Sequence, residues 1–514
     1  MEDMEEKENQ VARLERLKSV IDATDKNLAR LSNEAWAALQ MANDPPSLFR
    51  CGKNIVEMIT GENNSRPYAS LLTVDRLRHL MARVVYWKVL GKGRAWISAY
   101  PPVAVMKDML ATVSPPLPIL NRIVSVPVFA PSRELQTTPG YHPDSQTYFA
   151  PVNGLSIPEI KTNPTRKDAF ESAVFLMDEL LQDFPFVNNK SDIAHALGFL
   201  TLFVSRELIN GCTPLHIFEA ACHGTGKTLL SEILCHVGLG HFPDMLTEAH
   251  SQDEWRKRIT ATLLELPPLV FIENLQQRLD SPHLAAAITM SDWKDRRLGV
   301  TEMVKAPVRT IWAATGNNPT FSGEMARRSI RIRLIAKSER PWLSQKEFKH
   351  PDIKKWVAEN HGELLGKLLT MVKAWIVAGC PLSSKKLGMF EEWAQTIGGI
   401  LEFAGIPGFL ENLDEFYEAS DFETQSLGSF IRSWYEKYLT AEVGTSELFD
   451  LASEFLDLGF GNERSQRTCL GKKLGRLRDR QIEGFLVIGC DIVQGARQWR
   501  LQQVDNPIQV TGTS

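Results

Sequence analysis

The chain has 514 residues, of which 43% are hydrophobic and 23% charged, and its formal net charge is −4. This length is enough for about three domains that each bury a core, and no apolar run approaches the roughly 20 residues that span a bilayer. The mild negative charge does not indicate a nucleic-acid binder, so any such affinity must come from local patches.

The first segment, residues 1–41, begins with acidic and polar residues, the opposite of a signal peptide. Seven scattered cysteines without a C-x-x-C pair argue against structural zinc and fit a reducing compartment, so we expect a cytoplasmic protein with no membrane partner.

Apolar residues from Leu14 through Ile21 to Leu31 recur at three- and four-residue steps, which predicts an amphipathic helix. The pattern leaves open whether that helix docks on its own domain or forms an oligomerising coiled coil.

Residues 42–165 are predicted to form an N-terminal α+β, or collar, region. The prolines at 45 and 46 end one helix, and the stretch from Leu71 to Leu90 favours another. Dense prolines and the alternating run at 123–128 favour small strands and turns.

From Arg166 onward the sequence pattern indicates helices and buried apolar segments. Residues 166–340 are expected to form an α/β core that contains the catalytic motifs. Residues 341–440 follow as a helical lid or linker region, with breaks at Gly398-Gly399 and at 405–408. A small basic unit at 446–502 and a flexible tail at 503–514 complete the predicted organisation.

A strand, a glycine loop and a helix follow one another at residues 215–234. Gly224 and Gly226 permit backbone angles closed to other residues, so consecutive N–H groups can surround a phosphate at the helix N-terminus. Lys227 then places a cation at the β- and γ-phosphates of ATP, and the Thr228 hydroxyl can ligate Mg²⁺. The predicted nucleotide-binding residues are Ala221, Cys222, His223, Gly224, Thr225, Gly226, Lys227, Thr228 and Leu229. Ala221 departs from the glycine with which the P-loop pattern begins.

A second apolar strand, at 268–272, ends in Glu273 and Asn274. Glu273 stands where P-loop ATPases place an acid for the magnesium ion, and Asn274 stands where many of them place the glutamate that polarises the attacking water. The pair is therefore Glu-Asn and not the usual Asp-Glu. This leaves open whether Glu273 serves the metal, the water or both, with Asn274 orienting the water by hydrogen bonding.

A third buried strand, at 308–315, runs into Asn317 and Asn318, which are candidates to reach the γ-phosphate or its water. Downstream, Arg327 and Arg328 precede an alternating strand. A guanidinium supplied by a neighbouring subunit would neutralise charge in the transition state of phosphoryl transfer. The alternative for this pair is a surface ion pair only.

Together the four motifs, Gly-Thr-Gly-Lys-Thr, Phe-Ile-Glu-Asn, Ala-Thr-Gly-Asn-Asn-Pro and Glu-Met-Ala-Arg-Arg-Ser-Ile-Arg-Ile-Arg-Leu, resemble those of AAA+ helicases of phages, plasmids and integrative elements. These are close in style to superfamily 3 and MCM-like replicative helicases. The resemblance covers roughly Asp192 to Leu410, and the segments at 42–46 and 139–141 look like the connection between primase and helicase in larger relatives. We expect the helicase part without a primase domain.

The resemblance implies roles for several residues. Asn318 fits the sensor position, Arg328 with Arg327 fits the arginine finger, and residues 295–305 fit a hairpin facing a central pore. Lys294, Arg296, Arg297 and Lys305 would track phosphates there, or Arg296 and Arg297 would only brace the fold.

The C-terminal unit is predicted to be a winged helix that binds DNA, with a helix at 464–480 and two short strands at 485–488 and 497–501. The segment from Arg464 to Arg500 contains nine basic and three acidic residues. Arginine and lysine dominate, which favours phosphate affinity over base readout, and a merely solvated helical face is the alternative. The candidate DNA-binding residues are Arg467, Lys472, Lys473, Arg476, Arg478 and Arg480.

The sequence therefore predicts an α/β protein with a P-loop AAA+ core, helical flanking regions, an N-terminal α+β region and a C-terminal winged helix. The expected function is that of an ATP- and Mg²⁺-dependent DNA helicase, a homo-oligomer and most simply a hexamer, acting on single-stranded or forked DNA in replication of a phage or mobile element, with a separate primase or polymerase as a further partner. Two alternatives remain open. One is an ATP-controlled initiator or loader that binds DNA without unwinding it, and the other is an ATPase that remodels a protein partner.

Overall fold

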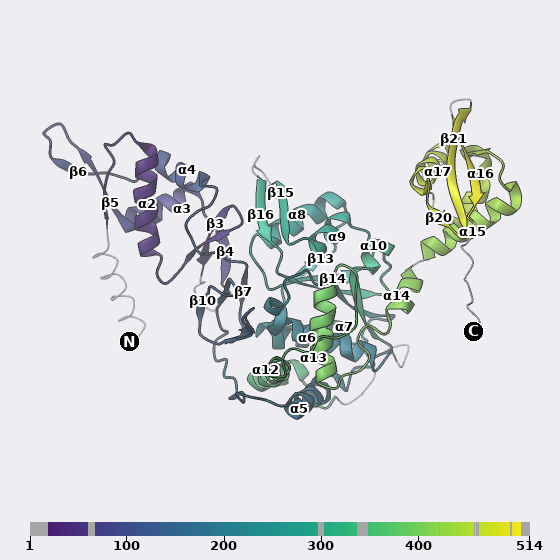
Figure 1. Ribbon diagram of the computed structural model, residues 1–514, viewed down its shortest axis with the longest axis horizontal. Helices are drawn as coiled ribbons and strands as arrows, with labels where there is room; N and C mark the ends of the chain where they lie inside the picture. Colours follow the sequence, from purple (N-terminus) through teal and green to yellow (C-terminus); the bar gives the residue numbers. More distant parts are fainter. Residues whose placement is uncertain are drawn as a thin grey trace, which may run out of the picture. The chain divides into compact units, whose positions relative to one another are not determined.

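The computed structural model describes residues 19–59, 67–296, 303–336, 348–420, 422–456, 458, 462–493 and 496–504. The chain divides into two compact units, Met1–Leu413 and Asp414–Ser514. Figure 1 shows the elements of both units with their labels. Among the described residues, no helix combines the length and the apolar character needed to cross a membrane.

The first unit begins with a three-stranded sheet of order β1-β5-β6 and three helices. Their bounds are β1 Ser19–Asp22, α2 Leu28–Ala42, α3 Val74–Val84, β5 Val85–Leu90, β6 Trp96–Ser98 and α4 Val103–Ala111. Ile21, Trp87 and Met106 are buried in a core shared by the sheet and the helices.

The helix predicted to run from Leu14 through Ile21 to Leu31 is wrong over its described part. Residues 19–22 form β1, which pairs in parallel with β5, and the helix begins only at Leu28, where the Asn27 side chain accepts a hydrogen bond from Arg30 N. Asp22 and Asn27 flank a polar turn that separates the two elements. The apolar spacing that suggested one helix stripe is therefore divided between a strand and a helix, and the residues before Ser19 lie outside the described part.

Small sheets follow, in the predicted collar region. One has the order β2-β3-β4, with β2 Leu48–Cys51, β3 Asn54–Ile59 and β4 Tyr68–Leu71. Another has the order β10-β11-β7, with β7 Arg122–Val124, β10 Gly140–His142 and β11 Thr147–Phe149, and β8 Val128–Phe129 pairs with β9 Leu135–Gln136. Short strands and turns at these positions agree with the dense prolines of this segment.

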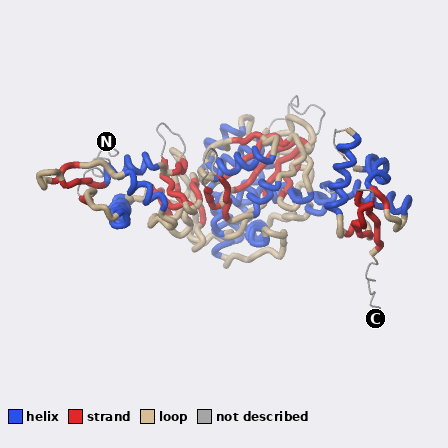
Figure 2. The backbone as a smooth tube through the Cα atoms, turned by 90° about the horizontal axis from the view of Figure 1, so that it is seen from above, coloured by secondary structure: helices blue, strands red, loops and turns tan. Residues whose placement is uncertain are grey.

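A five-stranded parallel sheet forms the centre of the first unit, with the order β13-β14-β17-β12-β18. Its strands are β12 Leu215–Ala220, β13 Met245–Thr247, β14 Leu269–Leu275, β17 Ile311–Asn317 and β18 Ser329–Leu334. All six residues of β12 and the first six of β17 are buried, as expected when both faces of a parallel sheet are covered. Figure 2 shows these strands among helices.

Helices flank this sheet in chain order. They are α5 Arg166–Leu176, α6 Ser191–Ser205, α7 Lys227–Leu239, α8 Gln252–Leu263, α9 Pro282–Thr289, α10 Gly323–Ala326, α11 Ile353–Glu359, α12 His361–Val377 and α13 Glu391–Phe403. A short π-helix at Met177–Leu181 and a short 3₁₀ helix at Arg206–Leu208 lie between them. The break predicted at Gly398-Gly399 is wrong, because α13 continues through both residues. A Cβ at Gly399 would lie 2.3 Å from the carbonyl oxygen of Pro381, so this glycine serves close packing and not a turn.

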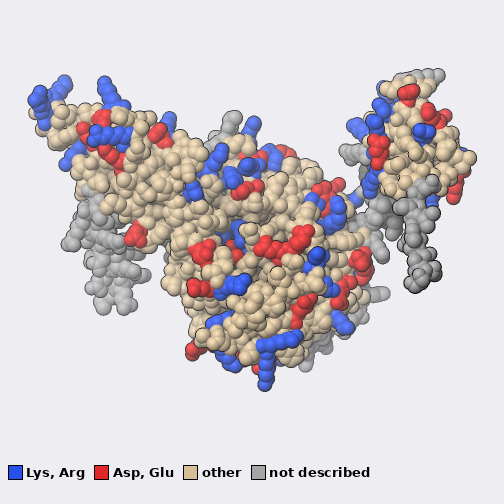
Figure 3. Space-filling view, viewed as in Figure 1, with Lys and Arg blue, Asp and Glu red and all other residues tan. Residues whose placement is uncertain are grey.

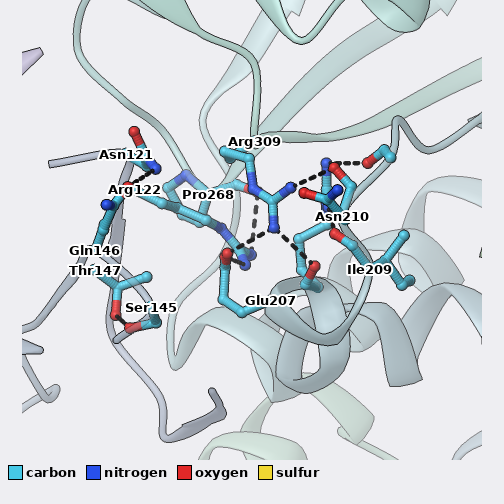
Figure 4. Close-up of polar contacts among 12 residues, drawn as sticks. Asn121, Arg122, Ser145, Gln146, Thr147, Glu207, Ile209, Asn210, Pro268 and Arg309 are labelled. Atoms are coloured by element: carbon cyan, nitrogen blue, oxygen red, sulfur yellow. Dashed lines mark hydrogen bonds and ion pairs between the residues drawn. The ribbon is translucent and has the colours of Figure 1, made fainter. Parts of the chain in front are cut away.

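Within the first unit, a buried ionic network joins β7 of the collar region to the segments next to the central sheet (Figure 4). Arg122 pairs with Glu207 at 3.2 Å, and Arg309 pairs with the other oxygen of Glu207 at 2.9 Å. Burial lowers the pKa of Arg122, and it lowers that of the adjacent Arg206 to about 9. Burial alone would raise the pKa of Glu207, but Arg309, Arg122 and Arg206 outweigh it, so that pKa is lowered. Removing one charge from such a network leaves the others unpaired in a low dielectric.

The second unit contains helices and an antiparallel sheet of order β19-β22-β21-β20. Its elements are α14 Leu413–Ser420, α15 Phe422–Tyr438, β19 Val443–Gly444, α16 Thr445–Phe455, α17 Glu463–Leu477, β20 Gln481–Ile482, β21 Phe485–Val493 and β22 Ala496–Gln503. Leu470 and Leu474 on α17 are buried with Trp434 and Trp499. Because α15 contributes to this core, it belongs to the second unit, whereas the sequence analysis grouped it with the lid region.

Candidate functional site

The glycine loop connects β12 to α7 at the carboxyl end of the central sheet, where open parallel sheets bind their ligands. Gly224 and Gly226 have φ values of 75° and 98°, the left-handed region that glycine adopts without strain. Gly226 also lies against the ring of Phe184, which a Cβ would approach to 3.3 Å. Thr225 closes the loop by donating a hydrogen bond to the carbonyl oxygen of Cys222 at 2.8 Å. The loop thus has the conformation that phosphate binding at a helix N-terminus requires.

Lys227, the first residue of α7, contacts the neighbouring strand end. Its Nζ donates to Asn317 Oδ1 at 2.8 Å, and the amide of Asn317 contacts His223 Nδ1 at 3.2 Å. Burial lowers the pKa of Lys227, and the nearby Glu273 carboxylate partly offsets that effect. The lysine is therefore held at the mouth of the loop by an uncharged partner that it can exchange for a phosphate.

Asn317, and not Asn318, occupies the position next to the lysine. Asn317 ends β17 and pairs with Ala220 in the parallel register, whereas Asn318 is exposed and has a φ of 42°. The backbone N–H of Asn318 donates to Ala220 O at 3.1 Å. Asn317, one residue before the position that the resemblance indicated, is therefore the asparagine of this strand that contacts Lys227, and the sensor role of Asn318 stays a prediction.

An irregularity in β14 turns two adjacent side chains toward one cavity. The register against β17 shifts between Ile272 and Leu275, Asn274 has a φ of 56°, and its N–H donates to Thr315 Oγ1 at 2.9 Å. In a regular strand neighbouring side chains point to opposite faces. The bulge removes that alternation, so Glu273 and Asn274 both line the same space.

That space is an open cavity of about 610 Å³ beside the glycine loop. The predicted residues among its lining are His223, Lys227, Thr228, Glu273 and Asn274, and the residues that the sequence analysis missed are Thr247, Glu248, His250, Arg258, Gln276 and Thr315. Thr228 and Glu273 supply a hydroxyl and a carboxylate to one cavity, and oxygen ligands of this kind suit Mg²⁺. These residues fit the predicted nucleotide and metal.

Glu248 and Arg258 are the charged residues that sequence reasoning overlooked. Glu248 follows β13 and accepts hydrogen bonds from the N–H groups of Gln276 and Gln277 at 2.8 and 3.2 Å. Arg258, on α8, donates to the carbonyl and hydroxyl oxygens of Thr247 at 2.7 and 2.8 Å. The available signal was the acid directly after the short run Met245-Leu246-Thr247, the same pattern that singled out Glu273.

The two predicted finger arginines lie away from this cavity. Arg328 precedes β18, and its carbonyl oxygen accepts from Leu215 N at the first residue of β12. The cavity lies at the other end of β12, about 17 Å further at roughly 3.3 Å per residue. Arg328 pairs with Glu324 at 3.3 Å, and its side chain is mostly buried. Arg327 is exposed and donates to Gly323 O at 3.2 Å. Neither arginine reaches the cavity of its own chain.

Two antiparallel strands are present at the position of the predicted hairpin, and its orientation toward a pore stays a prediction. β15 Asp292–Arg296 pairs antiparallel with β16 Met303–Pro307, and Asp295 anchors it to α8 through Arg256 at 2.7 Å. Lys305 pairs with Asp292 at 3.1 Å. Arg297 lies outside the described residues.

The candidate DNA-binding side chains of the second unit differ in their surroundings. Lys472 and Arg480 are exposed, Lys473 is half-buried, and Arg478 lies 3.4 Å from Asp479. Arg467 stacks over Phe449, with its guanidinium 5.1 Å from the ring centroid. The side chain of Arg476 lies outside the described part.

Comparison with family models and with curated proteins gave no match. Solved structures do match. The apo structure of the NrS-1 C-terminal region is 10% identical, with 91% of this chain and 99% of that chain covered and a TM-score of 0.36. The active helicase Cch of SCCmec type IV is 11% identical, with 88% and 91% covered and a TM-score of 0.34. JCV helicase is 14% identical, with 47% and 67% covered and a TM-score of 0.22.

Two of these three neighbours are described as helicases. The identities and TM-scores are low, so the assignment of the site rests on its own residues.

Proposed function

We propose that this chain is an ATP-dependent DNA helicase of the AAA+ class. The observation that carries the proposal is the contact between Lys227 and Asn317 at the carboxyl ends of β12 and β17, beside a cavity that Thr228 and Glu273 also line. A lysine, a hydroxyl, a carboxylate and a polar amide around a glycine loop are the groups that bind and cleave a nucleoside triphosphate. The N–H groups at the start of α7 hold the phosphates.

In this proposal the side chains that line the cavity have different tasks, and Glu273 has two. Lys227 leaves Asn317 for the β- and γ-phosphates, and the released Asn317 amide donates to the γ-phosphate or the attacking water. Glu273 accepts a hydrogen bond from that water, and Asn274 orients it. Thr228 and Glu273 would hold Mg²⁺, which would neutralise charge on the phosphates. Arg258 supplies a further cation at the rim of the cavity.

The arginine pair completes the site of another copy. Arg327 and Arg328 lie at the opposite end of the sheet from their own cavity, so they act on a nucleotide only in a neighbouring subunit. Arg327 is the more accessible, since Arg328 is paired with Glu324. This arrangement favours a ring of identical subunits, for which we propose a hexamer, with ATP between them.

We further propose that the second unit is a winged helix that binds DNA phosphates. The order of α16, α17 and the β21–β22 hairpin fits a helix pair followed by a β wing, and α17 buries leucines while leaving Lys472 exposed. Replacing Lys472 and Arg480 with alanine should lower the slope of log affinity for duplex DNA against log salt by about 0.9 for each lost phosphate contact.

Strand displacement tests the function directly. The full chain with ATP and Mg²⁺ should unwind forked DNA, and the Lys227→Ala variant should not. The Glu273–Asn274 pair favours a second candidate, an ATP-controlled initiator or loader that hydrolyses slowly, because the usual second carboxylate is an amide. ATPase activity that DNA stimulates without any displacement would establish that candidate in place of a helicase. ATPase activity that ignores DNA would point instead to a protein partner.

A further inference from the structure

The N-terminal sheet has one covered face and one open face along β1 and β5, whereas all three residues of β6 are exposed. Ile21, Val85 and Trp87 are buried in the core that α2, α3 and α4 complete. Alternate residues of a strand point to opposite faces, so Tyr86 and Lys88 of β5 lie on the other face.

The open face carries large exposed apolar side chains on all three strands. Tyr86 is 48% exposed, Trp96 is 55% exposed, and Val20 and Leu90 are similarly accessible. The register places Val20 opposite Tyr86 and Leu90 opposite Trp96, so these side chains are neighbours and not scattered residues. A contiguous exposed patch of this kind marks a binding surface.

Tyr100 extends this face. It lies two residues beyond Ser98, and Ala99 N donates to Trp87 O at 2.8 Å, which continues the pairing of β6 with β5. Tyr100 is 83% exposed. The face therefore presents three aromatic rings, and the rows of Tyr86 and Leu90 are about 13 Å apart at roughly 3.3 Å per residue.

Positive charge borders these rings. Lys88 lies on the face itself, and Lys92 and Arg94 lie in the turn between β5 and β6. None of the three forms an ion pair with the described residues. Figure 3 shows basic side chains gathered at the end of the first unit where Figure 1 labels β6. The acid on the face, Asp22, accepts a hydrogen bond from Thr24 N at 2.9 Å.

Arg94 occupies a costly backbone position. Its φ is 56°, a left-handed conformation that glycine adopts more cheaply than arginine. Gly91 N donates to Ala95 O and Arg94 N donates to Gly91 O, which closes the turn around it. The turn therefore fixes the backbone from which the Arg94 side chain extends.

We propose that the open face of the β1-β5-β6 sheet binds single-stranded DNA, with bases stacked on Trp96, Tyr86 and Tyr100 and phosphates held by Lys88, Lys92 and Arg94. Aromatic rings on a sheet with adjacent lysines and arginines suit an unpaired strand, since every base has a face that can stack. In a duplex those faces are already stacked on one another. This inference rests on the proposed function, because an unwinding motor generates such a strand, and it adds a binding site outside the ATPase and the C-terminal unit.

Anisotropy of a fluorescently labelled oligo-dT with the full chain tests the inference. Trp96→Ala should weaken binding about 5- to 150-fold, the range of one lost stacking contact, and Trp96→Phe should restore most of it. The double variant Lys92→Ala with Arg94→Ala should lower the salt slope by about 1.4, at about 0.7 for each phosphate contact of a single strand. Duplex affinity and DNA-free ATPase activity should stay at the wild-type values.

Matched controls lie in the same part of the chain. Tyr68→Ala removes a similarly exposed aromatic from β4, and Lys107→Ala removes an exposed lysine from α4. Equal effects of Trp96→Ala and Tyr68→Ala on oligo-dT affinity would overturn the inference. So would unchanged affinity for Trp96→Ala combined with altered oligomeric state or thermal stability, because the face would then bind a second copy or residues 1–18. If the wild-type chain neither binds oligo-dT nor shows stimulation of its ATPase by it, the proposed function itself fails.

Discussion

The central sheet and the N-terminal sheet offer different parts of themselves for binding. Helices and strands bury β12 and β17 along nearly their whole length, so only the carboxyl ends of the central strands are accessible. In the β1-β5-β6 sheet one face is buried along β1 and β5, and the other face exposes Tyr86 and Trp96. A parallel sheet covered on both faces can bind ligands only at the carboxyl ends of its strands. A sheet covered on one face can bind a ligand along its other face.

This difference also separates two kinds of side chain. At the carboxyl ends of the central strands the polar groups contact one another, as in the pair of the buried Lys227 and the half-buried Asn317, so their geometry is set before a ligand arrives. On the open face of the β1-β5-β6 sheet the aromatic rings are exposed, so a bound ligand can adjust its position on them. Substitutions at the carboxyl ends of the central strands should therefore strongly lower the rate of ATP hydrolysis. Substitutions on the open face of the N-terminal sheet should lower the affinity for its ligand.

The largest expected effect is at the bulge of β14. Glu273→Gln keeps the size of the side chain but removes the charge, and ATP turnover should fall about 10²- to 10⁴-fold, the range for a lost acid–base contribution. Asn274→Ala should cost less, because an amide orients the water without accepting a proton. Steady-state phosphate release measures both. A dead Asn274→Ala beside a nearly normal Glu273→Gln would reverse the two roles.

The next effect concerns the network that joins the collar region to the central unit. Glu207→Ala leaves Arg122 and Arg309 without their shared partner, and the free energy of unfolding should fall by about 3–5 kcal/mol. Urea denaturation measures it. Glu34→Ala is the control, since its partner Arg30 is exposed and such pairs contribute little. A loss no greater for Glu207→Ala than for Glu34→Ala would show that the collar is not held by this network.

A smaller effect on stability is expected when the pH is lowered, because of His195 on α6, the helix that packs on β18. His195 is buried, its Nδ1–H donates to Arg331 O at 2.8 Å, and its Nε2 accepts from Leu410 N at 3.1 Å. Burial lowers the pKa of His195 to about 4, below the unfolded value of about 6.5. Protons therefore bind the unfolded chain first, and stability falls as the pH drops from about 6.5 to about 4.

This single histidine should contribute about 2 kcal/mol to the loss of stability between pH 7 and pH 5. Unfolding by urea at both pH values measures the loss. His195→Gln can keep a donor and an acceptor without titrating, so its stability should depend less on pH. An identical pH dependence in this variant would rule out His195 as a source.

The parts of the molecule that follow from local sequence were predictable. The strand, glycine loop and helix at 215–234 are contiguous, and each residue type has a single physical reason to be there. The helix predicted at 464–480 corresponds to α17, because helical periodicity alone indicates it. Predictions failed where tertiary contacts decide: β1 depends on its pairing with β5, and α13 continues through Gly398 and Gly399 because other segments pack against them.

The candidate site shows the same limit. Whether Asn317 or Asn318 meets Lys227 depends on the register between β12 and β17, which the sequence does not specify to one residue. Glu248 and Arg258 reach the cavity from a short strand and from α8, far from the P-loop in the chain. No motif connects them, so only the folded arrangement brings them together.

The central claim is that a nucleotide site at the strand ends of one subunit is completed by an arginine of another, and mixing of variants tests it most directly. One variant carries Lys227→Ala, and the other carries Arg327→Ala with Arg328→Ala. Each should be inactive alone, because one lacks the phosphate lysine and the other lacks the charge that stabilises the transition state. In mixtures some interfaces pair an intact lysine with an intact arginine, and ATPase activity should reappear and be greatest at intermediate ratios. Mixtures that assemble but stay inactive at every ratio would contradict the claim.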